Sequence, residues 1–137
     1  MNEIYYVDIQ ATADHSAAFA SRCSCAYCRN FRKVFPVQCS EASGILEKFG
    51  LTVAADIDTI DYFWNEARDK RVYYAYYSVK GTLSQDGYVL YNGDAKITLY
   101  QEDSAGPVCP ESEMESPYFI LEVEAELPWW LEESPDD

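Results

Sequence analysis

The stretch CSCAYC, residues 23 to 28, holds three of the chain's five cysteines within six positions. A fourth, Cys39, is separated from Cys28 by ten residues. Zinc binds four thiolates in a tetrahedral arrangement, and a C-x-x-C turn lets two sulfurs approach one ion. The spacing therefore predicts a structural zinc site formed by Cys23, Cys25, Cys28 and Cys39, a metal-stabilised module.

Two other interpretations of the same cysteines stay open. Cys28 shares a helical face with Phe31 and Phe35, which is typical of a buried and unreactive thiol. Cys25 and Cys28 could instead form the redox pair of a thiol oxidoreductase, because a helix N-terminus and neighbouring Arg side chains stabilise a thiolate. Thioredoxin-like proteins place this motif after a strand, whereas the preceding ATADHSAAFASRCS has no strand pattern.

The segment LTVAADIDTI, residues 51 to 60, resembles the first motif of haloacid-dehalogenase phosphatases. By that resemblance Asp56 would be the nucleophile, Asp58 the general acid, and the two would hold magnesium. The match ends there, because that fold alternates strands and helices and the sequence after Asp58 is almost wholly strand-like. A solvated acidic loop is the favoured interpretation.

The other patterns of metal binding or catalysis are weaker still. An EF-hand starting at Asp56 would need different residue types at Ile60, Asp61 and Ala67. His15 is the single histidine, and no nucleophile stands out as its partner. We assign no catalytic residue, and an enzymatic function is disfavoured although it stays open.

The charge of the chain is strongly asymmetric. The net charge is −14, and residues 102–137 contain twelve acidic residues without a Lys or Arg. Residues 15–40 have no Asp or Glu, and they carry four basic residues, namely Arg22, Arg29, Arg32 and Lys33. Such a chain repels nucleic acid and anionic membranes and is steered toward a basic protein partner.

Length and hydropathy predict one cytoplasmic domain over residues 1–137. The longest apolar runs are short, as in IYYV at residues 4 to 7, far below the roughly 20 residues of a membrane helix. The N-terminus carries an acidic residue where a secretory signal would be basic. We expect a mobile loop near 102–117 and a frayed acidic tail at 132–137.

The first part of the chain predicts a strand over residues 3–9 and then two helices. Apolar spacing predicts the first helix from a cap at Ser24 to Phe35, with Pro36 forcing its end. The second begins at a Ser40 cap and ends in a Schellman motif at Gly50.

From Ile57 onward the pattern changes to that of strands. Residues 60–66 and 71–81 predict a hairpin, although Ile57, Ile60, Trp64 and Ala67 would also allow a short helix. The turn pairs Asp86-Gly87 and Asn92-Gly93 predict a meander. YFILEVEAEL at residues 118–127 alternates apolar and polar residues, so one face of that strand should be core and the other wet. The fold class is therefore α+β, an antiparallel meander sheet with two N-terminal helices packed on one face.

Three short motifs add a resemblance. CAYCRNF at 25–31, YYAYYSVKG at 73–81 and LPWWLEE at 127–133 resemble a family of small uncharacterised proteins of Gram-positive bacteria. The resemblance implies no activity, cofactor or catalytic residue. From charge and aromatic content, we expect a non-enzymatic binding module for a basic protein, similar to small acidic inhibitors or immunity proteins.

Overall fold

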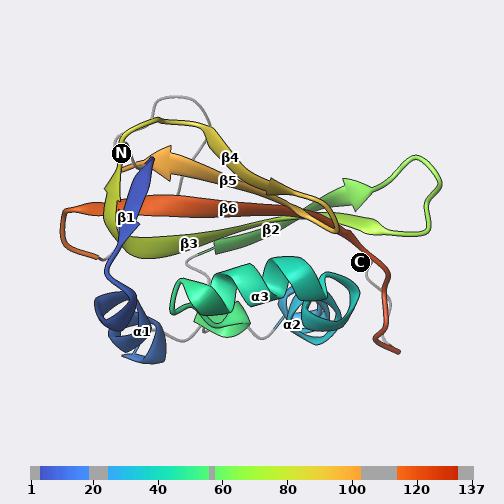
Figure 1. Cartoon of the computed structure of the whole chain (residues 1–137). Coiled ribbons are helices and arrows are strands. Elements are labelled where there is room, and N and C mark those ends of the chain that lie inside the picture. The colour runs from blue at the N-terminus through green and yellow to red at the C-terminus, as the bar shows by residue number, and fades with distance from the viewer. Residues whose placement is uncertain (1–3, 19–24, 56–57, 103–113, 133–137) are drawn as a thin grey trace.

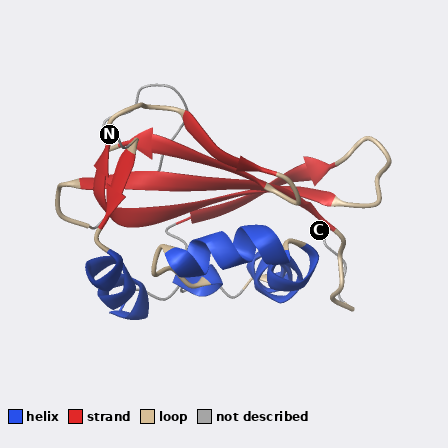
Figure 2. Cartoon of the chain, viewed as in Figure 1, coloured by secondary structure: helices blue, strands red, loops and turns tan. Residues whose placement is uncertain are grey.

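The computed structural model describes residues 4–18, 25–55, 58–102 and 114–132, and for residues 18, 55 and 58–63 it describes the backbone only. The described residues form a six-stranded sheet with three α-helices on one side of it (Figures 1 and 2). This confirms the α+β class and the packing of helices on one face. The greater part of the predicted mobile loop, 103–113, and of the predicted tail, 133–137, lies outside the described residues. No described helix has the length and apolar character that a membrane crossing requires.

All described strand pairings are antiparallel. The long strand β3 pairs with β6 along one edge, while β1 and β2 share its other edge. From β6 the sheet continues through β5 to β4. The strands are β1 (Tyr5–Val7), β2 (Asp58–Trp64), β3 (Arg71–Leu83), β4 (Tyr88–Asn92), β5 (Lys96–Gln101) and β6 (Tyr118–Leu127).

The predicted meander is correct for β4, β5 and β6 but not for β3. The final strand β6 lies between β3 and β5, so β3 and β4 are not neighbours. The Asp86-Gly87 turn therefore does not close a two-residue hairpin but belongs to a connection across the end of the sheet. Turn chemistry fixes a local reversal, whereas the choice of a strand's neighbour depends on burial across the whole sheet. The predicted hairpin of β2 and β3 is confirmed, and the alternative of a short helix before it is wrong.

The core lies between the helices and one face of the sheet. On β6 the alternation holds on this side, where five side chains are buried: Phe119, Leu121, Val123, Ala125 and Leu127. From the helices, four fully buried or nearly fully buried side chains meet them: Phe31, Val34, Phe35 and Leu46. Packing of this apolar set is the main stabilising contribution to the fold.

The first element differs from its prediction. Only Tyr5–Val7 is a strand, and residues 9–18 form a helix, α1 (Ile9–Ala18), that the sequence analysis did not predict. Its apolar pattern is weak because its inward contacts are polar. The Thr12 hydroxyl oxygen accepts the Lys80 N–H at 3.0 Å, and the Ser16 hydroxyl oxygen accepts the Thr52 N–H at 3.2 Å. These hydroxyls accept hydrogen bonds from backbone N–H groups of a strand and a loop. A search for apolar periodicity does not detect such polar contacts.

Helix α2 (Ala26–Gln38) passes through Pro36 instead of ending before it. A proline inside a helix removes one backbone hydrogen bond. Here the loss falls within the last turn, and the helix ends three residues later at Cys39, whose N–H donates to the Phe35 carbonyl at 2.8 Å. Burial of Phe31 and Phe35, whose rings stack at 5.0 Å, holds this turn in place. The predicted cap, Ser24, lies outside the described residues.

Helix α3 (Ser40–Lys48) begins at Ser40, which is not its cap. The Asp94 carboxylate, from the turn between β4 and β5, accepts the N–H groups of Glu41 at 3.0 Å and Ala42 at 3.3 Å. The cap therefore comes from a residue far along the chain. At the other end, Gly50 has φ +89°, and the N–H of Leu51 donates to Leu46 at 2.9 Å, which confirms the Schellman motif.

Candidate functional site

The cysteines at the start of α2 have different surroundings. Cys25 occupies the N-cap position of α2 in extended conformation, with φ −66° and ψ 163°, and is exposed. Cys28 lies in the first turn of the helix and is 6% exposed. The three cysteines that the structure describes, Cys25, Cys28 and Cys39, are reduced.

Cys39 is buried where α2 meets α3. Its thiol donates a hydrogen bond to the backbone carbonyl of Asp94 at 3.1 Å. Burial, together with the negative charge of Asp94, raises the pKa of the Cys39 thiol to about 11. At neutral pH this group is a neutral thiol and a poor nucleophile.

The predicted zinc set is only partly described. Cys23 lies outside the described residues, and the described part of the chain contains no group of three or more His, Cys, Asp or Glu residues able to hold a metal ion. Zinc binding through Cys39 would require loss of its hydrogen bond to Asp94 and of its proton. The four-cysteine site therefore stays a prediction.

The acidic D-x-D-x-T segment lies in a context that differs from that of the phosphatases. Asp58 begins β2, in register with Tyr76 of an antiparallel neighbour. Asp56 lies outside the described residues. Open α/β sheets place such residues at the ends of parallel strands, and every described pairing here is antiparallel. His15 lies in the last turn of α1.

A buried asparagine joins the three short motifs. Asn30 is fully buried, and its amide N–H groups donate to the Tyr73 hydroxyl at 3.2 Å and to the Pro128 carbonyl at 3.1 Å. Its carbonyl oxygen accepts the N–H of Trp130 at 2.8 Å. The Tyr73 hydroxyl donates to the Tyr27 carbonyl at 3.1 Å. CAYCRNF, YYAYYSVKG and LPWWLEE thus meet at one place in the fold.

Aromatic rings enclose a buried cation beside this network. Arg71 is 7% exposed, and its guanidinium carbon lies 4.9 Å from the ring centre of Trp64 and 5.6 Å from that of Tyr27. Trp129 meets the Tyr27 ring edge-on at 5.8 Å. Cation–π contacts of this kind stabilise a charge removed from water. These contacts attach the segment after β6 to the helical layer.

Sequence reasoning missed both central residues of this region, Asn30 and Arg71. Asn30 was visible only as a part of CAYCRNF, with no polar partner nearby in the sequence. Arg71 follows a polar turn and has the pattern of a solvated charge. Two partners of Asn30, Pro128 and Trp130, come from the far end of the chain, so no local pattern could have paired them. Trp64 faces Arg71 across the β2–β3 hairpin, whereas Tyr27 lies on α2.

The sheet face opposite the helices, the outer face, carries acidic and aromatic side chains in rows across three strands. One row is Tyr76, Glu122 and Thr98, and the next is Tyr74, Glu124 and Lys96. Tyr74 and Glu124 are half-buried, and Glu126 is exposed at the end of β6. The described helices cover the other face (Figure 2). The carboxylates of Glu124 and Glu126 on the outer face, called the acidic strip below, are therefore separate from the core.

Two positions of β6 on the outer face depart from the predicted wet pattern. Glu122 is 7% exposed, and its neighbour Ile120 is 2% exposed. Burial raises the pKa of the Glu122 carboxyl above its ordinary value of 4.5, a hydrogen bond with Tyr76 opposes this, and the charge of Glu124 adds to it. Glu124 and Glu126 therefore provide the accessible carboxylates of β6.

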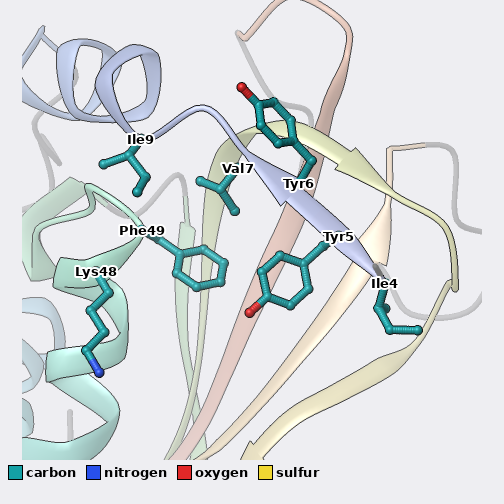
Figure 3. A pocket seen from close by; sticks show the side chains of 7 residues that line it. All are labelled: Ile4, Tyr5, Tyr6, Val7, Ile9, Lys48 and Phe49. Atoms are coloured by element: carbon teal, nitrogen blue, oxygen red, sulfur yellow. The ribbon is translucent and has the colours of Figure 1, made fainter. Parts of the chain in front are cut away.

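A pocket of about 530 Å³ lies beside β1, between the start of α1 and the end of α3 (Figure 3). Its lining is mostly apolar, with Ile4, Tyr5, Tyr6, Val7, Ile9, Lys48 and Phe49 around it. The rings of Tyr5 and Phe49 lie 5.6 Å apart at its inner wall. In Figure 3 the side chains of Tyr5, Val7 and Phe49 point toward one another, while the Lys48 ammonium points away. The pocket therefore presents an apolar wall without a convergent set of polar groups.

Comparison with known proteins assigns no family. No family model, no curated protein and no solved structure matches this chain. Inference about function therefore rests on the residues themselves.

Proposed function

We propose that this chain is a non-enzymatic binding module that recognises a basic protein partner through the outer face of its sheet. The observation that carries the proposal is the row of carboxylates on β6, with Glu124 and Glu126 accessible between tyrosine-bearing strands. Carboxylates steer a basic surface into contact. Tyrosine provides large contact area at low entropic cost, and aromatic residues are enriched at protein interfaces.

Two lysines of the outer face reduce its negative charge, while the net charge of the whole chain adds to it. Lys96 is the cation in register with Glu124. Lys80 uses its ammonium group to donate to the Glu115 carbonyl at 2.8 Å. The chain as a whole carries a net charge of −14, so its long-range field has the same sign as the strip.

A capture experiment followed by a charge comparison tests this function. The native protein is used as bait at low ionic strength, bound proteins are identified, and affinity is measured for the purified basic partner. We expect the complex to weaken steeply with added salt, since exposed charges are screened within about 10 Å at 0.1 M. Recovery of no basic protein, or a complex indifferent to salt, would remove the support for the proposal.

Two double variants of equal charge separate the strip from the general field. Glu124→Gln with Glu126→Gln removes two charges from the outer face, whereas Asp14→Asn with Glu47→Gln removes two exposed charges from the helices. We expect the first pair to weaken binding about tenfold, equivalent to about 1.4 kcal/mol, and the second less than about twofold. Equal losses would show that net charge, and not this face, binds the partner.

A further inference from the structure

The N-terminus of α2 places two cysteines of different accessibility in one helical turn. Cys25 is the N-cap residue and is exposed, while Cys28 is the third residue of the helix and is 6% exposed. An N-cap side chain normally reaches back over the first turn, toward the third helical residue. The two cysteines therefore lie in one turn, with Cys25 exposed and Cys28 buried.

The spacing of Cys25 and Cys28 is compatible with a disulfide after a local movement. Side chains three residues apart in a helix have β carbons about 5–6 Å apart, and a disulfide needs roughly 3.5–4.5 Å. Cys25 has an extended backbone, with φ −66° and ψ 163°, so the adjustment falls at the residue that precedes the helix.

Cys25 differs from Cys39 in its access to solvent. Cys25 is exposed, and the first turn of α2 contains no Asp or Glu. Cys39 is buried, its thiol donates to the Asp94 carbonyl, and its pKa is raised to about 11.

We propose that Cys25 and Cys28 form a dithiol that low-molecular-weight disulfides oxidise reversibly to an intrahelical disulfide. The Cys25 thiolate attacks one sulfur of the small disulfide, forms a mixed disulfide and expels one thiolate. The Cys28 thiol loses its proton and attacks the Cys25 sulfur, which expels the second small thiolate. The protein loses two electrons and two protons, and the small disulfide is reduced to two thiols.

The test uses the full-length reduced protein and oxidised glutathione at pH 8, in the presence of a chelator. Acid-quenched samples are mapped by mass spectrometry after proteolysis. We expect a disulfide between Cys25 and Cys28, and we expect Cys39 to remain a thiol on the same timescale. Alkylation of the reduced protein should modify Cys25 at least about tenfold faster than Cys39. Pairing of Cys25 with Cys23, or equal alkylation of Cys25 and Cys39, would overturn the proposal.

Three variants assign the roles of the two sulfurs. Cys28→Ala keeps the buried position apolar and should accumulate a glutathione adduct at Cys25. Cys25→Ser should lose the rapid reaction, with glutathione addition to Cys28 slower by about tenfold or more. Cys39→Ala is the matched control and should oxidise like the native chain. An adduct that fails to accumulate in Cys28→Ala, with its melting curve intact, would refute the assignment of Cys25 as the attacking thiol.

Discussion

The side-chain carbonyl oxygen of Asn30 accepts a hydrogen bond from the backbone N–H of Trp130 at 2.8 Å, although the two residues are one hundred positions apart in the sequence. The same amide donates to the Pro128 carbonyl at 3.1 Å. Asn30 is fully buried, so these bonds form away from water and their loss would leave polar groups unsatisfied. This side chain attaches the segment after β6 to α2.

Replacing Asn30 should therefore be strongly destabilising. We expect Asn30→Ala to lower the free energy of unfolding by about 2–4 kcal/mol, because it removes the bonds to the Pro128 carbonyl and the Trp130 N–H and one of the two bonds of the Tyr73 hydroxyl. Urea unfolding followed by circular dichroism measures the change. Gln38→Ala, at an exposed position of the same helix, should change stability by less than about 0.5 kcal/mol. Similar losses for both variants would contradict the role given to Asn30.

Asp94 should be the residue that caps α3. Its carboxylate accepts the N–H groups of Glu41 and Ala42 and the hydroxyl of Tyr91 at 3.0 Å. We expect Asp94→Ala to cost about 1–2 kcal/mol of stability, and Asp94→Asn less, since Asn also caps helices. Ser40→Ala should be close to neutral. A larger loss for Ser40→Ala than for Asp94→Ala in thermal melts would restore Ser40 as the cap.

Glu122 should make stability depend on pH. Its folded-state pKa is raised above 4.5, chiefly by burial, so the folded protein holds this proton more tightly than the unfolded chain does. The stabilisation is present below pH 4.5 and is lost as pH rises through the folded-state pKa. Glu122→Gln removes this titration but keeps a hydrogen-bond acceptor for Tyr76.

Urea unfolding between pH 4 and pH 7 measures this effect. The stability of the native chain minus that of Glu122→Gln should fall as pH rises from about 4.5. The same series on Glu126→Gln shows what an exposed glutamate of the same strand contributes. A difference that stays flat, or that grows with pH, would show that Glu122 is not held in a desolvated setting.

Two glycines, Gly44 within α3 and Gly50 just after its end, should respond oppositely to alanine. Gly50 has φ +89°, and a β carbon there would lie 2.7 Å from the Ile9 carbonyl oxygen. We expect Gly50→Ala to cost at least about 2 kcal/mol, because of the backbone conformation and the overlap. Gly44, within α3, has no atom within 4 Å of its added β carbon.

Gly44→Ala is therefore the control for Gly50→Ala. It should raise stability by about 0.5–1 kcal/mol, the difference in helix propensity between the two residues. Thermal melts of both variants give the comparison. If Gly50→Ala were as well tolerated as Gly44→Ala, the close approach of α1 to the end of α3 would be wrong.

Local patterns were enough for several elements. The β6 span of residues 118–127 follows from strict alternation, because a strand covered on one side exposes alternate residues to water. The Gly50 stop follows from the special backbone conformation that glycine adopts without cost. The β2–β3 hairpin follows from β-branched and aromatic residues on both sides of a polar turn.

Features that depend on partners far apart in the sequence could not be predicted, because they arise from packing. They include the insertion of β6 beside β3, the cap that Asp94 gives to α3, and the polar contacts that hold α1. Burial of Glu122 has the same origin, since its strand alone predicts exposure. Composition and periodicity, which are local, were sufficient for the α+β class, the acidic charge and the cysteine spacing. Packing set the surroundings of the three described cysteines, since it leaves Cys25 exposed and buries Cys28 and Cys39.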